Sequence, residues 1–384
     1  MFKKRKEAIR KRIEERMEQR KTVVHFGAGA LGKGLVIPVL RDSGYKVAVV
    51  DANPEVVAYL KEKKKYRMKI ASEVSRSERD IDVEDAMLIG GEDARIVACV
   101  RKADTVTTSV RRENLGGVAA LIRRAWADGS DGDRRVLCCE NIENVSRFFS
   151  GLLRENGGAP ERIKIPDTVV DRGCASDPSD RMSVITEPFF EIGVDAKVLP
   201  DTRIRLIPSV ENLEKDFMRK RFLMNTFADV VAYFGLMENL AGFGAAVRDA
   251  ALQARLAPYF NLIRLALQTA YGMSDEEYAR WRSFYMERMG GADNGSRPME
   301  SIARGIWDKL DYKERIVYPV VLAGRNAYDI GAGTDVVAAI VANEIGRGRM
   351  SAPDAKTRCE TMWCVDEIGK RIFARVWEKV ESCG

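Results

Sequence analysis

Residues 22–51 read TVVHFGAGALGKGLVIPVLRDSGYKVAVVD, and this stretch decides the fold. It predicts an apolar strand, a glycine turn, a helix and a second apolar strand that ends on an acid. The turn at residues 27–32 fits the pattern G-x-G-x-x-G, with a strand before it and a helix after it. In that context the pattern is typical of a dinucleotide-binding Rossmann unit.

The three glycines of such a turn have separate roles. Gly27 permits the tight turn, Gly29 lets a pyrophosphate approach the backbone, and Gly32 lets the helix pack closely against the strand. The pyrophosphate then lies at the helix N-terminus, where N–H groups and the helix dipole favour anions. The alternative is a glycine-rich turn that binds nothing.

Asp51 follows Gly32 by 19 residues, at a position where a carboxylate can accept hydrogen bonds from a ribose diol. The same carboxylate would repel a 2′-phosphate, so the sequence favours NAD over NADP as the cofactor. Asn53 and Pro54 predict the N-cap and the first position of the next helix. The predicted cofactor-binding residues are Gly27, Gly29, Ala30, Leu31, Gly32, Asp51 and Asn53.

Strand-like and helix-like segments alternate through residues 22–205, which we interpret as an NAD-binding Rossmann domain. The alternation predicts an α/β domain with a doubly wound, mostly parallel sheet and a ligand beyond the carboxyl ends of its strands. Pro38 lies inside the first helix and predicts a kink there. Later strands are predicted at residues 105–110, 135–139, 168–171 and 182–185.

A 3.6-residue period replaces this alternation from about residue 210. Residues 206–384 are therefore predicted to form an all-α C-terminal domain, and a cleft between the two domains is where we expect the substrate. A long, largely buried helix should begin near residue 213. Further helices are predicted at residues 246–256, 258–271, 276–289, 314–324, 335–346 and 361–380, with a loop at 290–298.

Residues 1–21 form a basic extension with ten Lys and Arg against four Glu, which accounts for the whole net charge of +6. We predict a solvated helix or a frayed extension; binding to RNA or to a membrane is the alternative. The nearly neutral remainder does not indicate a nucleic-acid partner. The sequence contains no apolar run near 18 residues and no secretory signal, so a cytoplasmic protein without a membrane partner is expected.

The seven cysteines are irregularly spaced, and we interpret them as reduced thiols that lie mostly in the core. The chain contains one histidine, so we predict no metal site. That residue, His25, ends the first strand and is expected to be a packed or cofactor-side imidazole rather than the acid/base. Lys, Tyr, Cys or a carboxylate must then move the substrate proton.

Lys220 and Asn225 are the pair that we single out for the chemistry. They lie five residues apart in one long helix, so their side chains should point about 140° apart and meet one ligand only at a bend or around a tip. Burial can bring a lysine amine into the range suited to proton transfer, and an amide can donate to a substrate oxygen. The alternative is a solvated lysine and a helix-interior asparagine.

Two further candidates follow predicted strands. Glu140 and Asn141 come after residues 135–139, where a site role and a helix N-cap are both open. Asp171 and Arg172 follow an apolar TVV in the same way, and for them a site role and a structural ion pair are both open.

The chain resembles the mannitol-1-phosphate 5-dehydrogenases of the polyol-specific long-chain dehydrogenase family. The resemblance runs over most of residues 22–345 and rests on the motifs VVHFGAGALGKG, ADTVTTSV, CCENIENV, VVDRG, ITEPFFEI, NLEKDFMRKRFLMNTFADVVAYFG and VRDAAL. It implies a Rossmann domain, a helical C-terminal domain and metal-independent hydride transfer.

The resemblance also implies residue roles. The family has a Lys-x4-Asn-x2-His signature in which the lysine is the acid/base and the amide and imidazole bind the reacting oxygen; Lys220 and Asn225 match it, but Ala228 stands at the histidine position. The family's Asn and Asp after the two strands match Asn141 and Asp171. We therefore expect the catalytic residues to be Lys220, Asn225, Asn141 and Asp171.

A second departure from the family lies near residue 300. The family's basic stretch corresponds to SIARGIWDKL and then ERI, in which Arg304, Lys309 and Arg315 are retained, while Ser301 and Asp308 replace basic residues. The resemblance therefore implies Lys309 and Arg304 as substrate-binding residues. Fewer basic residues would weaken the binding of a phosphate group.

Several functions remain open from the sequence. The first is an NAD-dependent oxidoreductase acting on a sugar phosphate or polyol, such as the pair fructose 6-phosphate and mannitol 1-phosphate. A hexuronate reductase of the same family is a close variant. Ala228 and Ser301 favour a catalytically impaired NAD-binding regulator instead. The expected assembly is a monomer or a homodimer.

Overall fold

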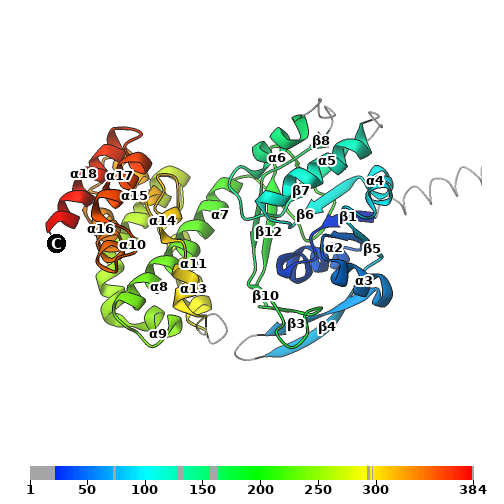
Figure 1. The fold of residues 1–384 in the computed structure, drawn as a ribbon, viewed down its shortest axis with the longest axis horizontal. Helices are drawn as coiled ribbons and strands as arrows, with labels where there is room; N and C mark the ends of the chain where they lie inside the picture. The colour runs from blue at the N-terminus through cyan, green and yellow to red at the C-terminus, as the bar shows by residue number, and fades with distance from the viewer. Residues whose placement is uncertain are drawn as a thin grey trace, which may run out of the picture. The chain divides into compact units, whose positions relative to one another are not determined.

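The computed structural model describes residues 22–71, 75–127, 133–155, 163–291, 295 and 297–382 (Figure 1). The predicted N-terminal extension, residues 1–21, lies outside the described residues. The chain divides into two compact units between Leu213 and Glu214. The predicted division was at residue 205; the structure keeps the next residues with the first unit because the strand Ser209–Val210 (β13) pairs there.

A six-stranded parallel sheet forms the centre of the first unit, in the order β5-β2-β1-β6-β7-β8. This arrangement confirms the predicted doubly wound α/β architecture, with the chain reversing direction across the sheet at β1 and β6. The strands are β1 (Thr22–Phe26), β2 (Lys46–Asp51), β5 (Asp85–Leu88), β6 (Thr105–Thr108), β7 (Arg134–Cys138) and β8 (Ile163–Lys164).

Both faces of the sheet are buried, because alternate residues of each strand point to opposite sides. Val23 of β1 and Val49 of β2 point to one face of the sheet, which α2 (Ile37–Asp42) and α3 (Pro54–Lys63) cover. Val24 and Val50 point to the other face. The helices that cover that face are α4 (Asp93–Lys102), α5 (Leu115–Trp126) and α6 (Val145–Arg154).

Two smaller sheets complete the first unit, and they correct the sequence prediction. Residues 168–171 and 182–185 were expected in the parallel sheet. Instead β9 (Thr168–Asp171) pairs antiparallel with β12 (Glu191–Asp195), and β11 (Val184–Thr186) lies in a four-stranded sheet with β10 (Cys174–Ser176). An apolar run marks a buried strand but does not say which sheet it joins.

The four-stranded sheet also contains a hairpin that the sequence analysis missed, formed by β3 (Lys65–Ala71) and β4 (Arg76–Asp82). Six of the seven residues of β4 are exposed, so its sequence lacks the apolar alternation that marks a strand. Cross-strand ion pairs join the two strands instead, from Lys65 and Arg67 to Asp80, at 2.7 Å each.

Pro38 lies in the second position of α2, directly after a π-helical segment at Gly32–Val36. Because proline has no N–H, it cannot donate to the carbonyl groups one turn earlier. Two distant side chains replace that donor: the Tyr66 hydroxyl donates to the Lys33 oxygen (2.7 Å) and Arg172 donates to the Gly34 oxygen (2.8 Å). The expected disturbance of the helix therefore takes the form of a π segment with external donors.

Helices build the second unit around one hydrophobic core. Its first three segments run on without a break: α7 (Leu213–Lys220), a π-helical segment at Arg221–Thr226 and α8 (Phe227–Met237). The remaining helices are α9 (Phe243–Arg248), α10 (Ala250–Tyr271), α11 (Asp275–Gly290), α13 (Met299–Ala303), α14 (Ile306–Lys309), α15 (Tyr318–Arg325), α16 (Gly331–Gly346), α17 (Ala352–Trp363) and α18 (Glu367–Ser382).

Two helix predictions in this unit were wrong. Residues 246–256 and 258–271 were expected as two helices, the second beginning at Pro258. Instead α10 runs through the proline, because its buried residues on both sides of Pro258 pack into the core. Residues 361–380 were expected as one helix. They form parts of α17 and α18, which a turn separates, and the carboxylate of Asp366 caps α18 through the Gly369 amide at 2.8 Å.

Candidate dinucleotide and proton-transfer sites

The glycine turn after β1 has the geometry that its sequence predicts. Gly27 has φ +107°, and a Cβ there would lie 2.5 Å from the Ser109 backbone oxygen. A Cβ on Gly32 would lie 2.8 Å from the imidazole of His25, so only glycine lets the helix approach so closely. Apart from its chain neighbours, no atom of the described residues lies within 4 Å of the position of a Cβ on Gly29. The backbone at Gly29 is therefore open to a ligand, at the start of a helix.

His25 packs beneath this turn and is fully buried. Its Nε2 lies 2.8 Å from the Gly27 carbonyl oxygen, and its Nδ1 lies 2.8 Å from the Thr107 hydroxyl. Because a carbonyl can only accept, Nε2 carries the proton and Nδ1 accepts from Thr107. Burial lowers the pKa of His25 to about 4, so the imidazole is neutral at pH 7. The prediction that His25 is a packed residue is confirmed.

Asp51 connects the end of β2 to the glycine turn. One carboxylate oxygen accepts from the Ala28 amide at 2.6 Å, and the other accepts from the Asn53 amide at 2.7 Å. Each oxygen keeps a second lone pair for a ribose hydroxyl. Asn53 caps α3 as predicted, because its side chain accepts from the Glu55 amide at 2.9 Å.

Lys33 adds a cation beside the turn that the sequence analysis did not single out. Its ammonium group donates to the carbonyl oxygens of Arg181 (3.2 Å) and Met182 (3.0 Å). Burial lowers the pKa of Lys33, while the nearby charges of Asp180 and Asp51 act in the opposite direction. The sequence shows Lys33 four positions after Gly29, but it does not show the hydrogen-bond partners of Lys33, which lie about 150 residues further along the chain.

The loop after β6 lies directly beside the glycine turn. The Ser109 amide donates to the Phe26 oxygen at 2.8 Å, and the Ser109 hydroxyl donates to the Gly27 oxygen at 3.1 Å. Two residues further on, Arg111 has φ 69° and ψ 158°. This backbone conformation is nearly restricted to glycine and costs about 1–3 kcal/mol for other residues.

Glu140, at the carboxyl end of β7, holds this loop. Its buried carboxylate accepts from the Thr108 hydroxyl at 2.7 Å and from the Val110 amide at 3.0 Å. Burial raises the pKa of Glu140, whereas these two hydrogen bonds act to lower it. Asn141, the next residue, is exposed. The N-cap alternative for this pair was wrong, because α6 begins at Val145 and the Asp167 carboxylate accepts from its Ser146 amide at 2.9 Å.

Asp171 is buried at the end of β9, where it pairs with Glu191 in the antiparallel ladder. Arg172 donates to the carbonyl oxygens of Glu187 (3.0 Å) and Gly34 (2.8 Å). Its guanidinium therefore joins the residue after β11 to the helix that follows the glycine turn. Arg172 has a structural role through these two carbonyl groups, and not through an ion pair with the neighbouring Asp171 that the sequence left open.

Lys220 directly precedes the π-helical segment of the second unit, and Asn225 lies within it. Lys220 is buried at the end of α7, and the half-buried Asn225 lies inside the segment. The predicted separation of about 140° assumed an α-helix. In a π-helix the hydrogen bonds run between residues five apart, which stacks such residues along one side of the helix. The local geometry therefore places this pair on one side without a break in the helix.

Three charged residues form a cluster beside that segment, in which Asp229 is buried and the two cations are partly buried. Asp229, at the start of α8, accepts from Lys309 at 2.9 Å and from Arg315 at 3.3 Å. Lys309 also donates to the Ile302 carbonyl oxygen at 2.6 Å. Lys309, predicted to bind the substrate, thus already holds a carboxylate and a carbonyl group, whereas Arg304 is exposed. Burial raises the pKa of Asp229, and its two cations act against that shift.

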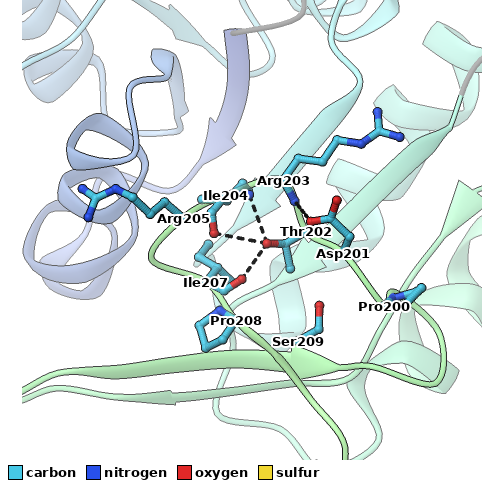
Figure 2. A pocket seen from close by; sticks show the side chains of 9 residues that line it. All are labelled: Pro200, Asp201, Thr202, Arg203, Ile204, Arg205, Ile207, Pro208 and Ser209. Carbon is cyan, nitrogen blue, oxygen red and sulfur yellow. Dashed lines mark hydrogen bonds between the residues drawn. The ribbon is translucent and has the colours of Figure 1, made fainter.

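A pocket of about 440 Å³ lies elsewhere in the first unit, and residues 200–209 line it without Leu206. Figure 2 shows Thr202 at its centre, where the hydroxyl lies 2.6 Å from the Ile207 oxygen and accepts from the Ile204 amide. Arg135, at the start of β7, donates to the Thr202 oxygen at 2.8 Å. The pocket is therefore near the amino ends of the parallel strands, away from the glycine turn.

The described residues contain neither a membrane-spanning helix nor a metal-binding cluster. No helix in the described part of the chain is long and apolar enough to cross a membrane. Within the same residues, no three His, Cys, Asp or Glu side chains form a group that could hold a metal ion. No disulfide joins the six cysteines that the structure describes.

The fold and the glycine turn define a class of protein, the oxidoreductases with a dinucleotide-binding Rossmann domain. Residues 21–207 match the family model described as "Mannitol dehydrogenase Rossmann domain". Over these residues the chain is similar to the mannitol dehydrogenase family.

Curated relatives agree with this assignment. The mannitol-1-phosphate 5-dehydrogenase of Streptococcus pneumoniae serotype 4 is 27% identical over 315 residues, which cover 77% of this chain and 82% of that protein. The enzyme of the same name from Brevibacillus brevis is 29% identical over 327 residues, with 80% of this chain and 83% of that protein covered.

Two solved structures have the same fold. A substrate-free D-sorbitol dehydrogenase matches with a TM-score of 0.73 at 14% identity, covering 92% of this chain and 91% of that one. Mannitol 2-dehydrogenase of Pseudomonas fluorescens, solved as a ternary complex with NAD and D-mannitol, matches with a TM-score of 0.71 at 13% identity. That match covers 94% of this chain and 92% of the other.

Proposed function

We propose that this protein is an NAD-dependent dehydrogenase that acts on a CH–OH group of a polyol or sugar phosphate. The observation that carries the proposal is the open backbone at Gly29, with the Asp51 carboxylate held against the same turn. The similarity to the mannitol dehydrogenase family and the names of the curated relatives support the reaction class.

The first unit provides the residues that would hold NAD. The backbone of residues 29–32 would hold the diphosphate at the start of the helix, and Asp51 would accept from the ribose hydroxyls. The carboxylate would disfavour a 2′-phosphate, so NAD would be preferred over NADP. The bound nicotinamide would supply the hydride chemistry, as acceptor in oxidation and as donor in reduction.

The second unit provides the proposed acid/base. The Lys220 amine takes the hydroxyl proton during oxidation and returns it during reduction, and the Asn225 amide donates a hydrogen bond to the reacting oxygen. The π segment that stacks these two residues supports this assignment. Asn141 and Asp171 are proposed to assist from the first unit.

The substrate is proposed as a member of the pair fructose 6-phosphate and mannitol 1-phosphate, or a related pair. Arg304 is exposed and could meet a phosphate, while Lys309 would first have to release Asp229. A non-phosphorylated polyol or a hexuronate is the second candidate, and the pairing of Lys309 favours it. One bidentate arginine is enough to hold a carboxylate.

The test is a screen of NADH oxidation at 340 nm with fructose 6-phosphate, fructose, tagaturonate and fructuronate, run in parallel with NADPH. We expect turnover of at least one of these compounds, with NADH preferred. Absence of turnover with all four, in protein that binds NADH, would favour the NAD-binding regulator that the alanine at position 228 suggests.

The acid/base assignment has its own test. Lys220→Ala should lower kcat at least about 100-fold while leaving the Kd for NADH within two-fold, because general acid–base catalysis contributes that much. Lys215→Ala is the matched control, since Lys215 lies on the same helix and pairs with Glu277 at 2.9 Å. Full activity of the Lys220 variant would refute the assignment.

A further inference from the structure

The loop after β6 carries a charged side chain on a strained backbone. Arg111 is exposed, and its φ of 69° with ψ of 158° is a conformation that glycine adopts readily and arginine does not. Such strain persists only where the surrounding structure imposes it. It is a feature from which a functional role can be inferred.

The surroundings impose this conformation through hydrogen bonds on both sides. The Val110 amide donates to Glu140 at 3.0 Å, and the Val110 oxygen accepts from the Asn114 side chain at 2.6 Å. The Asn114 amide donates to the Arg111 oxygen at 3.2 Å. The backbone on either side of Arg111 is therefore held, and with it the direction in which the side chain leaves the loop.

The same loop lies against the proposed diphosphate site. Ser109 bonds to the backbone of Phe26 and Gly27, and Arg111 is two residues further on, at most about 7 Å of chain away. Arg112 differs from it, because its guanidinium lies over the Phe148 ring at 4.5 Å. No hydrogen bond, ion pair or ring contact to another described residue engages the guanidinium of Arg111.

We propose that Arg111 is an oxyanion-binding residue whose guanidinium grips a phosphate oxygen beside the glycine turn. A guanidinium fork fits phosphate oxygens in a bidentate way, and the fixed backbone reduces the entropy lost when it binds. The phosphate belongs either to the diphosphate of the cofactor or to a phosphorylated substrate, so the inference rests on the proposed function. Neither the glycine fingerprint nor the lysine–asparagine pair includes this residue.

The experiment compares Arg111→Gly, Arg111→Gln and the control Arg112→Gln. Arg111→Gly should raise Tm by about 2 °C, because glycine relieves the strain, while Arg111→Gln retains the strain and the wild-type Tm. Both Arg111 variants should weaken a phosphate-bearing ligand about ten-fold through loss of a charge-assisted hydrogen bond. Arg112→Gln removes the same charge one residue away and should change affinity less than two-fold.

Two binding measurements separate the sources of the phosphate. The Kd for NADH is measured by fluorescence titration, and fructose 6-phosphate and fructose are titrated calorimetrically into the NADH complex. A higher Kd for NADH, with the affinity for fructose 6-phosphate unchanged, assigns Arg111 to the diphosphate of the cofactor. A loss of affinity confined to fructose 6-phosphate assigns Arg111 to the phosphate of the substrate. Either result supports the proposal. Unchanged affinities in both Arg111 variants, or equal losses in Arg112→Gln, would overturn it. Failure of the proposed function looks different, because wild-type protein would then not bind NADH.

Discussion

Single residues at the glycine turn have two kinds of role. Gly29 leaves space over the backbone for a ligand, whereas Gly27, Gly32 and His25 allow the turn to exist. His25, the one histidine of the chain, was expected to be a packed or cofactor-side imidazole rather than the acid/base. Its two hydrogen bonds and its burial make it a neutral support for the turn.

The first prediction concerns the open space at Gly29. Gly29→Val should raise the Kd for NADH at least about 100-fold, because a branched side chain would occupy the position of the diphosphate. The fold should remain intact, since no atom of the residues that the structure describes, apart from the chain neighbours, lies within 4 Å of the new Cβ. Asp51→Ala should also weaken binding, and it removes the acceptor of the Ala28 amide as well.

Fluorescence titration measures both affinities. Gly116→Ala is the matched control, because its Cβ also meets open space but lies on α5. An unchanged affinity in both the Gly29 and the Asp51 variants would show that the turn is not the cofactor site.

The second prediction follows from the pKa of His25, which folding lowers from 6.5 to about 4. Above pH 6.5 the imidazole is neutral in both states and has no effect on stability. As the pH falls from 6.5 to 4, the imidazole binds a proton in the unfolded state but not in the folded state, so the free energy of unfolding falls. Between pH 7 and pH 5 we expect this residue to lower the free energy of unfolding by about 2 kcal/mol.

Urea unfolding of the wild type and of His25→Gln at pH 7 and pH 5 measures the effect. The variant should lack this part of the pH dependence, although it should be less stable than the wild type at pH 7. An identical pH dependence in both proteins would contradict the buried, neutral state of the imidazole.

At the level of secondary-structure elements, the helix after the glycine turn and the helix that carries Lys220 and Asn225 each contain a π-helical segment. In the first unit the segment precedes Pro38, and side chains from other elements satisfy the carbonyl groups that proline leaves without a donor. In the second unit the segment at Arg221–Thr226 is held from outside, where the Thr226 hydroxyl lies 2.8 Å from the Arg315 carbonyl oxygen. These segments therefore depend on contacts with other parts of the same unit.

The third prediction tests the charged cluster beside the second segment. Asp229→Ala removes the carboxylate that holds Lys309 and Arg315 and should lower the free energy of unfolding by about 2–4 kcal/mol, because two partly buried cations lose their partner. Asp308→Ala is the matched control, since its pair with Arg358 is exposed and should contribute less than about 1 kcal/mol.

Chemical denaturation with a probe in the second unit, such as tryptophan fluorescence, would measure both changes. Equal effects of the two substitutions would show that the Asp229 cluster contributes no more than a surface ion pair.

For the whole molecule, the two units have separate hydrophobic cores and different proposed roles. NADH should therefore slow amide exchange in a limited set of segments. We expect protection at residues 27–33, 51–55 and 109–114, and none in α17 and α18. Hydrogen exchange followed by mass spectrometry with and without NADH is the measurement.

Gly29→Val provides the control, because it should abolish the protection at NADH concentrations that saturate the wild type. Protection spread evenly over both units would contradict a cofactor site built on the glycine turn.

The sequence by itself determined the Rossmann turn, the acid at the end of β2, the doubly wound sheet and the resemblance to the mannitol dehydrogenases. These features depend on neighbouring residues, because backbone conformation at Gly27 and close packing at Gly32 are local requirements that few residue types meet. The helical character of the second unit was readable for the same reason, since a 3.6-residue period is a local pattern.

Only the tertiary structure decided the rest. The β3–β4 hairpin, the Arg172 bond to Gly34, the Glu140 bonds to the loop after β6 and the Asp229 cluster join residues that are distant in the chain. The π segment that follows Lys220 and contains Asn225 was equally hidden, because its sequence suits an α-helix. Long-range partners satisfy polar groups and override local preference, and no spacing along the chain records which partners meet.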